Sequence, residues 1–266
     1  MRTASTAGRP ARHTREEIRA LMMEAGLGLL VDQGLGVGAG DLTFKKVFDR
    51  VELTTGIRLT NASVIRRAWE NQAEFQDAVL AAVARAGDAG DESGATADAL
   101  LPLLGSIDRS TGQGRLRALS EVCRVGGAAS LRALVDSRSW ALWVGVWVLA
   151  VTGAPSERVD RVRQALLDGY EATTELWMGL HGAMIDALGL RLRSPFTLRQ
   201  FTVSVGALVE GCALREGSER QAAVLLRPSG PAGEPQEWTL FAVGLEALAH
   251  QFLELDPDWV HPDVED

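Results

Sequence analysis

Apolar residues recur at intervals of three and four positions along almost the whole chain of 266 residues. This spacing is that of one face of an α-helix, and the sequence has no convincing alternating, β-branched runs bounded by hairpin turns. The hydrophobic share of 46% and the charged share of 23% match an ordinary globular protein. The sequence therefore predicts an all-α fold, and its composition excludes disordered, fibrous and membrane-embedded classes.

The sequence carries no signal of a membrane-spanning helix or of a secretory leader. The longest apolar run, residues 140–151, is shorter than the roughly 20 residues that a membrane-spanning helix needs. The basic amino-terminal segment leads into no apolar core of a secretory signal. Cys123 and Cys212 provide neither a disulfide framework nor a CxxC metal spacing. We expect a cytoplasmic protein that has no membrane partner and keeps both thiols reduced.

Charge is distributed unevenly along the chain, whose net charge is -8. Residues 1–86 carry 12 Lys and Arg against 10 Asp and Glu, whereas residues 87–266 carry 15 against 25. The only lysines are Lys45 and Lys46. A basic head therefore precedes an acidic body, and the head is the part suited to a polyanionic partner, although a basic tail can also be a solvated, disordered segment.

Two stretches rich in small residues, glycine and proline indicate how the chain is divided. Residues 86–97 are small, acidic and rich in glycine, which predicts a linker, and residues 227–235 predict a loop between two helical segments. We expect a basic arm over residues 1–13, a first domain over residues 14–86 and a second over residues 87–266.

Capping residues mark the start of the first two helices. Thr14 and Glu17 have the spacing of a capping box, which opens a helix that ends near Gly34. Thr43 is the predicted N-cap of a short second helix with one apolar and one basic side. The glycines that separate the two helices follow a helix and not a strand, so we interpret them as a flexible link and not as a phosphate-binding loop.

The next segment completes a compact helical pattern. A turn containing Gly56 leads to a third helix that starts near Thr60 or Asn61 and runs to about Trp69, which we expect in the core. Residues 71–74 form another capping box, which opens a long fourth helix. A short helix, a glycine-containing turn and a second helix with a basic face are typical of a helix-turn-helix.

Residues 14–83 resemble the amino-terminal DNA-binding domain of TetR-family transcriptional repressors. The pieces that carry the resemblance are Thr55-Gly56-Ile57, the run from Asn61 to Trp69 and the run from Asn71 to Phe75. The turn is about three residues longer than the family usually has, and Gln72 stands where the family has a lysine. The resemblance implies a homodimer that binds a palindromic double-stranded DNA operator, and a larger helical domain that dimerises and binds a small effector.

The candidate DNA contacts are polar residues of the arm and of the second and third helices. They are Arg12, Arg15, Thr43, Lys45, Lys46, Thr60, Asn61, Ser63, Arg66 and Arg67. Arginine and asparagine side chains can read bases, and lysines near phosphates supply affinity that depends on salt. The alternative for the arginine pair is a solvated helical face.

Aromatic residues of the second domain indicate a ligand site. Trp140, Trp143 and Trp147 share a stripe on one helix, and a long helix that opens at Pro155-Ser156 carries Tyr170, Thr174, Trp177, Met178 and His181. The stripe could be ordinary core, and the histidine could be satisfied by a neighbour. The sharper interpretation makes these residues the walls of a cavity for a small apolar effector.

The last two predicted helices, residues 195–215 and 237–255, are candidates for a four-helix interface between two copies of the chain; the first would open at Ser194-Pro195. No motif of a hydrolase, a nucleotide-binding loop or a metal site is present, so we expect no enzyme, no cofactor and no metal. The predicted function is a ligand-responsive transcriptional repressor. The alternative is a helical small-molecule-binding or scaffold protein that does not read DNA.

Overall fold

The computed structural model describes residues 13–35, 39–60, 64, 68–86, 89–216, 224–229 and 233–260. Within these ranges the chain is largely helical with only short strands, so the predicted all-α class is confirmed. Two compact units are present: a first unit of residues 1–85 and 144–166, and a second unit of residues 86–143 and 167–266. The sequence had assigned residues 144–166 to the second domain.

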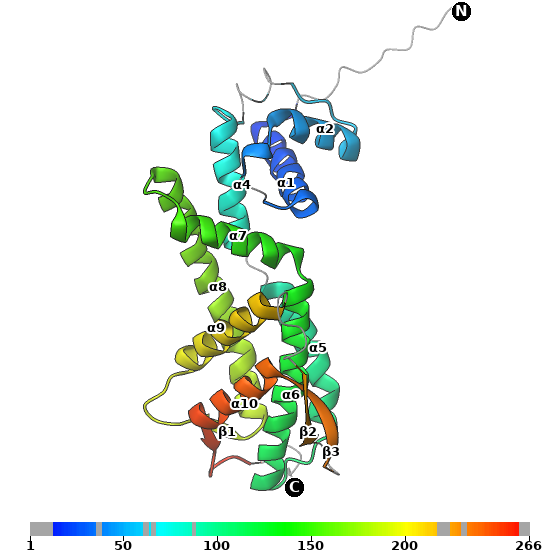
Figure 1. Cartoon of the computed structure of the whole chain (residues 1–266), viewed down its shortest axis with the longest axis vertical. Coiled ribbons are helices and arrows are strands. Elements are labelled where there is room, and N and C mark those ends of the chain that lie inside the picture. Colours follow the sequence, from blue (N-terminus) through cyan, green and yellow to red (C-terminus); the bar gives the residue numbers. More distant parts are fainter. Residues whose placement is uncertain are drawn as a thin grey trace, which may run out of the picture. The chain divides into compact units, whose positions relative to one another are not determined.

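The first unit is built from capped helices. Its elements are α1 (Arg15–Gln33), the 3-10 turn η1 (Ala39–Asp41), α2 (Phe44–Thr55), α4 (Gln72–Ala86) and parts of α7 (Arg138–Thr152) and α8 (Glu157–Ala187). Thr14 and Glu17 form the predicted capping box at the start of α1. The Thr43 hydroxyl caps α2, and Gly56 ends α2 with a positive φ of 74° that favours glycine. Figure 1 shows α1 and α2 in blue.

Asp77 explains why part of α8 belongs to the first unit. This α4 residue pairs with Arg158 at 2.8 Å and with Arg161 at 2.7 Å, both on the first turns of α8. On α7, a Cβ added at Gly145 would lie 3.1 Å from the Leu35 side chain, so the two segments are in close contact. Residues 144–166 therefore pack as part of the first unit.

Aromatic rings fill the core of the first unit. Phe75 of α4 is fully buried, with Trp69 at 5.3 Å and Phe44 at 5.8 Å between ring centroids. The Arg19 guanidinium lies 3.9 Å from the centre of the Trp69 ring and donates a hydrogen bond to the Ala68 carbonyl. Trp69 is thus a core residue, as the sequence predicted.

The second unit surrounds α6. Its elements are α5 (Ala89–Ser106), α6 (Gly112–Asp136), the remaining parts of α7 and α8, β1 (Leu190–Leu192), α9 (Leu198–Glu216), β2 (Val224–Ser229), β3 (Glu234–Thr239), α10 (Leu240–Phe252) and β4 (Leu253–Leu255). α5, α9 and α10 all pack against α6 (Figure 1). A continuous apolar cluster lies between these helices.

The predicted linker over residues 86–97 is wrong for residues 89–97, which lie in α5. Glu92, Thr96 and Leu100 are buried at four-residue spacing on the side of α5 that packs against α6. Burial of this stripe stabilises a helix whose glycine-rich composition favours a loose connection.

The described part of the chain also contains two short antiparallel sheets, which the periodicity did not predict. β2 and β3 pair on either side of the turn within residues 227–235, the stretch predicted as a loop, and both strands extend beyond it; β1 pairs with β4 over three residues each. Pro228 and Pro235 are partners in the first sheet. Proline is tolerated there because both strands of a two-stranded sheet are edges. The three-residue strands β1 and β4 carry too few residues to display a period of two.

The last two helices are shorter than predicted. α9 starts at Leu198 and not at Pro195, because Thr197 and Gln200 supply the N-terminal cap through reciprocal side-chain to backbone hydrogen bonds. α10 covers residues 240–252 of the predicted 237–255 and packs against α6 and α9 of its own unit.

The described α-helices range in length from 12 to 31 residues. None of them alone combines the length and the apolar composition needed to cross a membrane, whereas α6 and α7 taken together, as a bent pair, meet the length and composition criteria.

The aromatic core of the first unit predicts a large cost for removing Phe75. Phe75→Ala should lower the free energy of unfolding by about 3–5 kcal/mol, because the ring is fully buried between other aromatic side chains. Leu53→Ala is the control, since Leu53 is 81% exposed and its loss should change stability by about 0.5 kcal/mol or less. Urea denaturation measures both, and equal midpoints would contradict the assignment of this core.

Candidate functional site

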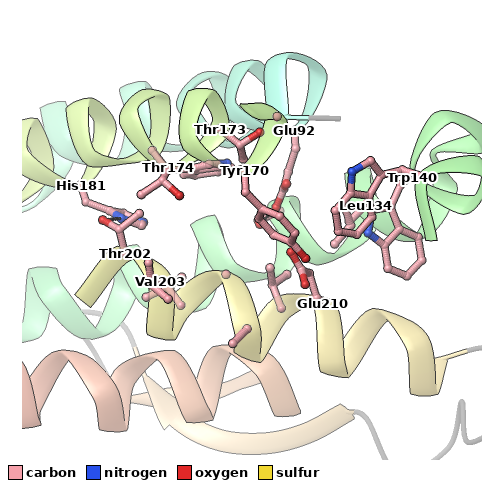
Figure 2. Close-up of a pocket in the computed structure, with 18 residues that line it drawn as sticks. Glu92, Leu134, Trp140, Tyr170, Thr173, Thr174, His181, Thr202, Val203 and Glu210 are labelled. Carbon is pink, nitrogen blue, oxygen red and sulfur yellow. Dashed lines mark hydrogen bonds between the residues drawn. The ribbon is translucent and has the colours of Figure 1, made fainter. Parts of the chain in front are cut away.

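A cavity of about 240 Å³ lies in the second unit. Its wall is formed by residues of α5, α6, α7, α8 and α9, and Figure 2 shows their side chains converging on it. The lining residues are Glu92, Ser130, Leu134, Trp140, Trp143, Gly169, Tyr170, Thr173, Thr174, Trp177, His181, Thr202, Val203, Val205, Gly206, Ala207, Val209 and Glu210. The cavity is mainly apolar, with a few polar groups at defined places, as small-molecule sites are.

Most of the residues predicted to line a ligand site surround this one cavity. They are Trp140, Trp143, Tyr170, Thr174, Trp177 and His181. Trp147 and Met178 do not line it, and the Trp147 side chain is 41% exposed. Trp147 differs from its neighbours on the stripe because it belongs to the part of α7 that packs in the first unit.

The aromatic side chains form two contact pairs on the wall. Trp143 and Tyr170 meet edge to face, with ring centroids 5.1 Å apart and an angle of 79° between the ring planes. Trp177 lies 5.5 Å from the ring of His181, which in turn contacts Phe201 at 5.3 Å. Such pairs restrict the ring orientations, so a ligand meets a preformed aromatic surface.

Glu210 of α9 brings a carboxylate to the cavity. Tyr170 and Glu210 point toward one another in Figure 2, and their side chains share a hydrogen bond in which the tyrosine hydroxyl donates. Burial raises the pKa of Glu210, while this hydrogen bond acts in the opposite direction. Burial, followed by the charge of Glu210, raises the pKa of Tyr170, so the phenol remains protonated and available as a donor.

His181 brings an uncharged imidazole to the same wall. Its Nδ1 lies 3.0 Å from the Thr202 hydroxyl of α9, and burial lowers the pKa of the ring to about 4. The ring is therefore neutral at pH 7, and its hydrogen bond with Thr202 satisfies one of its nitrogen atoms. The prediction that a neighbour could satisfy this histidine agrees with that contact.

The sequence reasoning missed five polar residues of the wall: Glu92, Ser130, Thr173, Thr202 and Glu210. The Ser130 hydroxyl of α6 donates a hydrogen bond to the buried Glu92 carboxylate. Glu92 fell in the segment predicted as a linker, and its four-residue spacing from two other buried residues was the signal that could have placed it on a helix. Single polar residues on α9 carry no comparable signal, because an isolated polar side chain on a helix is usually solvated.

A second cavity of about 80 Å³ adjoins the first. The two share Ser130, Trp177, His181 and Val205, and the second is otherwise lined by core residues such as Cys123 and Phe241. Burial raises the pKa of the Cys123 thiol. This cysteine is accordingly a protonated core residue and a poor nucleophile at neutral pH.

The predicted DNA contacts lie in the first unit, and the structure describes half of them. Arg12, Asn61, Ser63, Arg66 and Arg67 lie outside the described residues. The candidates that are described are Arg15, Thr43, Lys45, Lys46 and Thr60.

Lys45 and Lys46 are exposed on the first turn of α2, next to the Thr43 cap. Arg15 and Thr60 are also exposed, on α1 and after the end of α2. The lysines thus present two positive charges at the N-terminus of a helix, where the helix dipole also favours an anion.

Gln72 and Gln76 of α4 hold the start of α2. The Gln72 side-chain carbonyl accepts a hydrogen bond of 3.0 Å from the Phe44 N–H, and the Gln76 amide donates one of the same length to the Leu42 carbonyl. The side chain of Gln72 is therefore engaged in positioning α2.

The described residues offer no metal centre, since no three of their His, Cys, Asp and Glu side chains are grouped closely enough to hold an ion. No protein-family model and no curated protein matches the chain.

The low pKa of His181 predicts an acid-dependent loss of stability. The folded protein disfavours the charged ring, so this contribution is complete above the ordinary pKa of 6.5 and is lost as the pH falls toward 4. The loss should reach at most about 3 kcal/mol in the free energy of unfolding. His181→Gln keeps a partner for Thr202 but does not titrate, so its unfolding free energy should fall less between pH 6.5 and 4. Parallel pH profiles for the two proteins would contradict the assignment.

Proposed function

We propose that the chain is a ligand-responsive transcriptional repressor of the TetR type, which binds a palindromic DNA operator as a homodimer and releases it when a small molecule occupies the cavity. The observation that carries this proposal is that the two units have different features, each suited to a different kind of partner. The first has the capped helices and exposed basic side chains of the helix-turn-helix pattern, and the second has an aromatic cavity.

Support for DNA binding comes from the first unit. Val64 and Ala68 each donate a backbone hydrogen bond to the residue four positions earlier, with lengths of 3.1 and 2.8 Å, and both side chains are buried. Val64 and Ala68, four positions apart, thus face the core, as residues on the inner side of a recognition helix would. Lys45 and Lys46 would contact phosphates.

Support for effector binding comes from the position of the cavity between helices. A molecule held by α7, α8 and α9 can change the conformational equilibrium only if it binds one state of the dimer better than the other. A state with wrongly spaced recognition elements cannot place both in successive major grooves, so a ligand that favours this state lowers the affinity for the operator.

Support for a dimer comes from the exposed surfaces of α8 and α9. Leu176 on α8 and Leu214 on α9 are 46% and 57% exposed, and an added Cβ at Gly179 or Gly211 would meet open space. Both helices therefore offer apolar surface to a second copy of the chain.

Operator binding tests the proposal directly. The protein should bind its own upstream intergenic DNA more tightly than a scrambled fragment, with a steep decrease in affinity as salt increases. Replacing Lys45 and Lys46 with alanine should weaken binding to both fragments and reduce the salt slope by about 1 for each phosphate that the lysines no longer neutralise.

The control for this measurement is Arg117→Ala with Arg132→Ala, which removes the same charge from exposed positions on α6. Its salt slope should equal that of the unchanged protein. Weak and equal binding to the native and scrambled fragments would instead favour a helical binding protein that does not read DNA.

Charges on the proposed interface should separate the dimer. Leu176→Glu combined with Leu214→Glu places like charges where the two copies would meet, so the protein should elute as a monomer and bind a palindromic site with at least about tenfold lower affinity. Leu101→Glu, at a 67% exposed position of α5, is the matched control and should remain dimeric. Light scattering after size exclusion measures the mass, and an unchanged dimer in the double variant would reject this interface.

A further inference from the structure

We propose that the cavity selects a small organic cation, a molecule with an apolar body and one positively charged nitrogen that lies against the Glu210 carboxylate and the aromatic rings of the wall. The inference rests on the proposed function, because it names the chemical class of the effector for the same cavity.

The charges of the wall favour a positive ligand. Two of the residues that line the cavity, Glu92 and Glu210, carry carboxyl groups, and none of the lining residues that the structure describes is a lysine or an arginine. The remaining titratable groups there, Tyr170 and His181, are neutral at pH 7. A cation would therefore enter a site of negative potential, while an anion would be repelled.

Glu210 is placed to act as the counterion. The Tyr170 hydroxyl occupies one of the roughly four acceptor positions of its carboxylate and orients it along the cavity wall. A buried carboxylate is costly unless an opposite charge or several hydrogen bonds compensate it. A ligand ammonium group supplies an opposite charge. A purely apolar ligand would remove water from the carboxylate without replacing the lost hydrogen bonds.

The aromatic rings add a second interaction with the same preference. Trp140, Trp143, Trp177 and Tyr170 all line the cavity. Tryptophan is the strongest side-chain partner for a cation over its ring face, and the attraction increases when water is excluded. Carboxylate and ring faces together distinguish a cation from a neutral molecule of the same shape.

The size of the cavity limits the ligand. Its volume of about 240 Å³ lies just below the range of roughly 300–1,000 Å³ of pockets for drug-sized molecules. Single-ring molecules are therefore suitable probes. Benzyltrimethylammonium is the cation, neopentylbenzene is its uncharged isostere with carbon in place of nitrogen, and phenylacetate is an anion of similar size.

The experiment measures binding of each probe to the purified full chain, without DNA, by isothermal titration calorimetry and by quenching of tryptophan fluorescence. Benzyltrimethylammonium should bind at least about tenfold more tightly than neopentylbenzene, and phenylacetate should bind more weakly than both. Equal or tighter binding of the uncharged isostere, or no binding of the cation, would overturn the proposal.

A pair of glutamate variants locates the charge. Glu210→Gln retains an oxygen that can accept from Tyr170 but removes the charge, so it should weaken the cation about tenfold and leave neopentylbenzene unchanged. Glu175→Gln is the matched control, because Glu175 is exposed on α8, pairs with Arg199 and does not line the cavity. Equal affinities for the cation in the unchanged protein and both variants would show that the Glu210 charge does not contribute to binding, and would overturn the role of Glu210.

Failure of this inference can be distinguished from failure of the repressor function. A chain that prefers the cation but does not discriminate its upstream DNA keeps the ligand class and loses the repressor proposal. A chain that binds its operator but prefers the uncharged isostere loses only the ligand class.

Discussion

The close approach of helices at Gly126 and Gly127 is the constraint on which the second unit depends. A Cβ added at Gly126 would lie 3.2 Å from the Leu100 side chain of α5, and one added at Gly127 would lie 3.2 Å from the Cα of Ala242 in α10. The two neighbouring glycines thus let α6 contact a helix on either side. One turn further along α6, Ser130 reaches Glu92 of α5, so the same contact that packs the core also places a carboxylate at the cavity.

Features fixed by neighbouring residues were the ones that the sequence could predict. The caps at Thr14, Thr43 and Ser156 depend on a side chain and a backbone N–H two or three residues away, and all three are present. The tryptophan spacing on α7 likewise placed Trp140 and Trp143 on a common side of the helix. Such arrangements require no knowledge of what packs against them.

Features that depend on distant partners could not be read in the same way. The burial of α5 on α6 overrides a composition that favours a linker, and it determines that Glu92 lies inside the protein. Glu210 belongs to the cavity only because α9 lies alongside α8, where Tyr170 and His181 meet Glu210 and Thr202. No pattern within α9 encodes that neighbour.

Two titratable groups on facing helices respond to burial in the same direction, since both resist becoming charged. Burial lowers the pKa of His181 and raises that of Glu210. Both residues line the cavity, but they differ in what could reverse the effect: Thr202 and the aromatic rings beside His181 offer no charge, whereas the Glu210 carboxylate can pair with a cationic group of a ligand. A cation in the cavity would stabilise the ionised form of the carboxylate and disfavour protonation of the histidine. The wall thus combines a carboxylate whose charge a cationic ligand would stabilise with a histidine that stays neutral, and the difference lies in their chemistry and their neighbours.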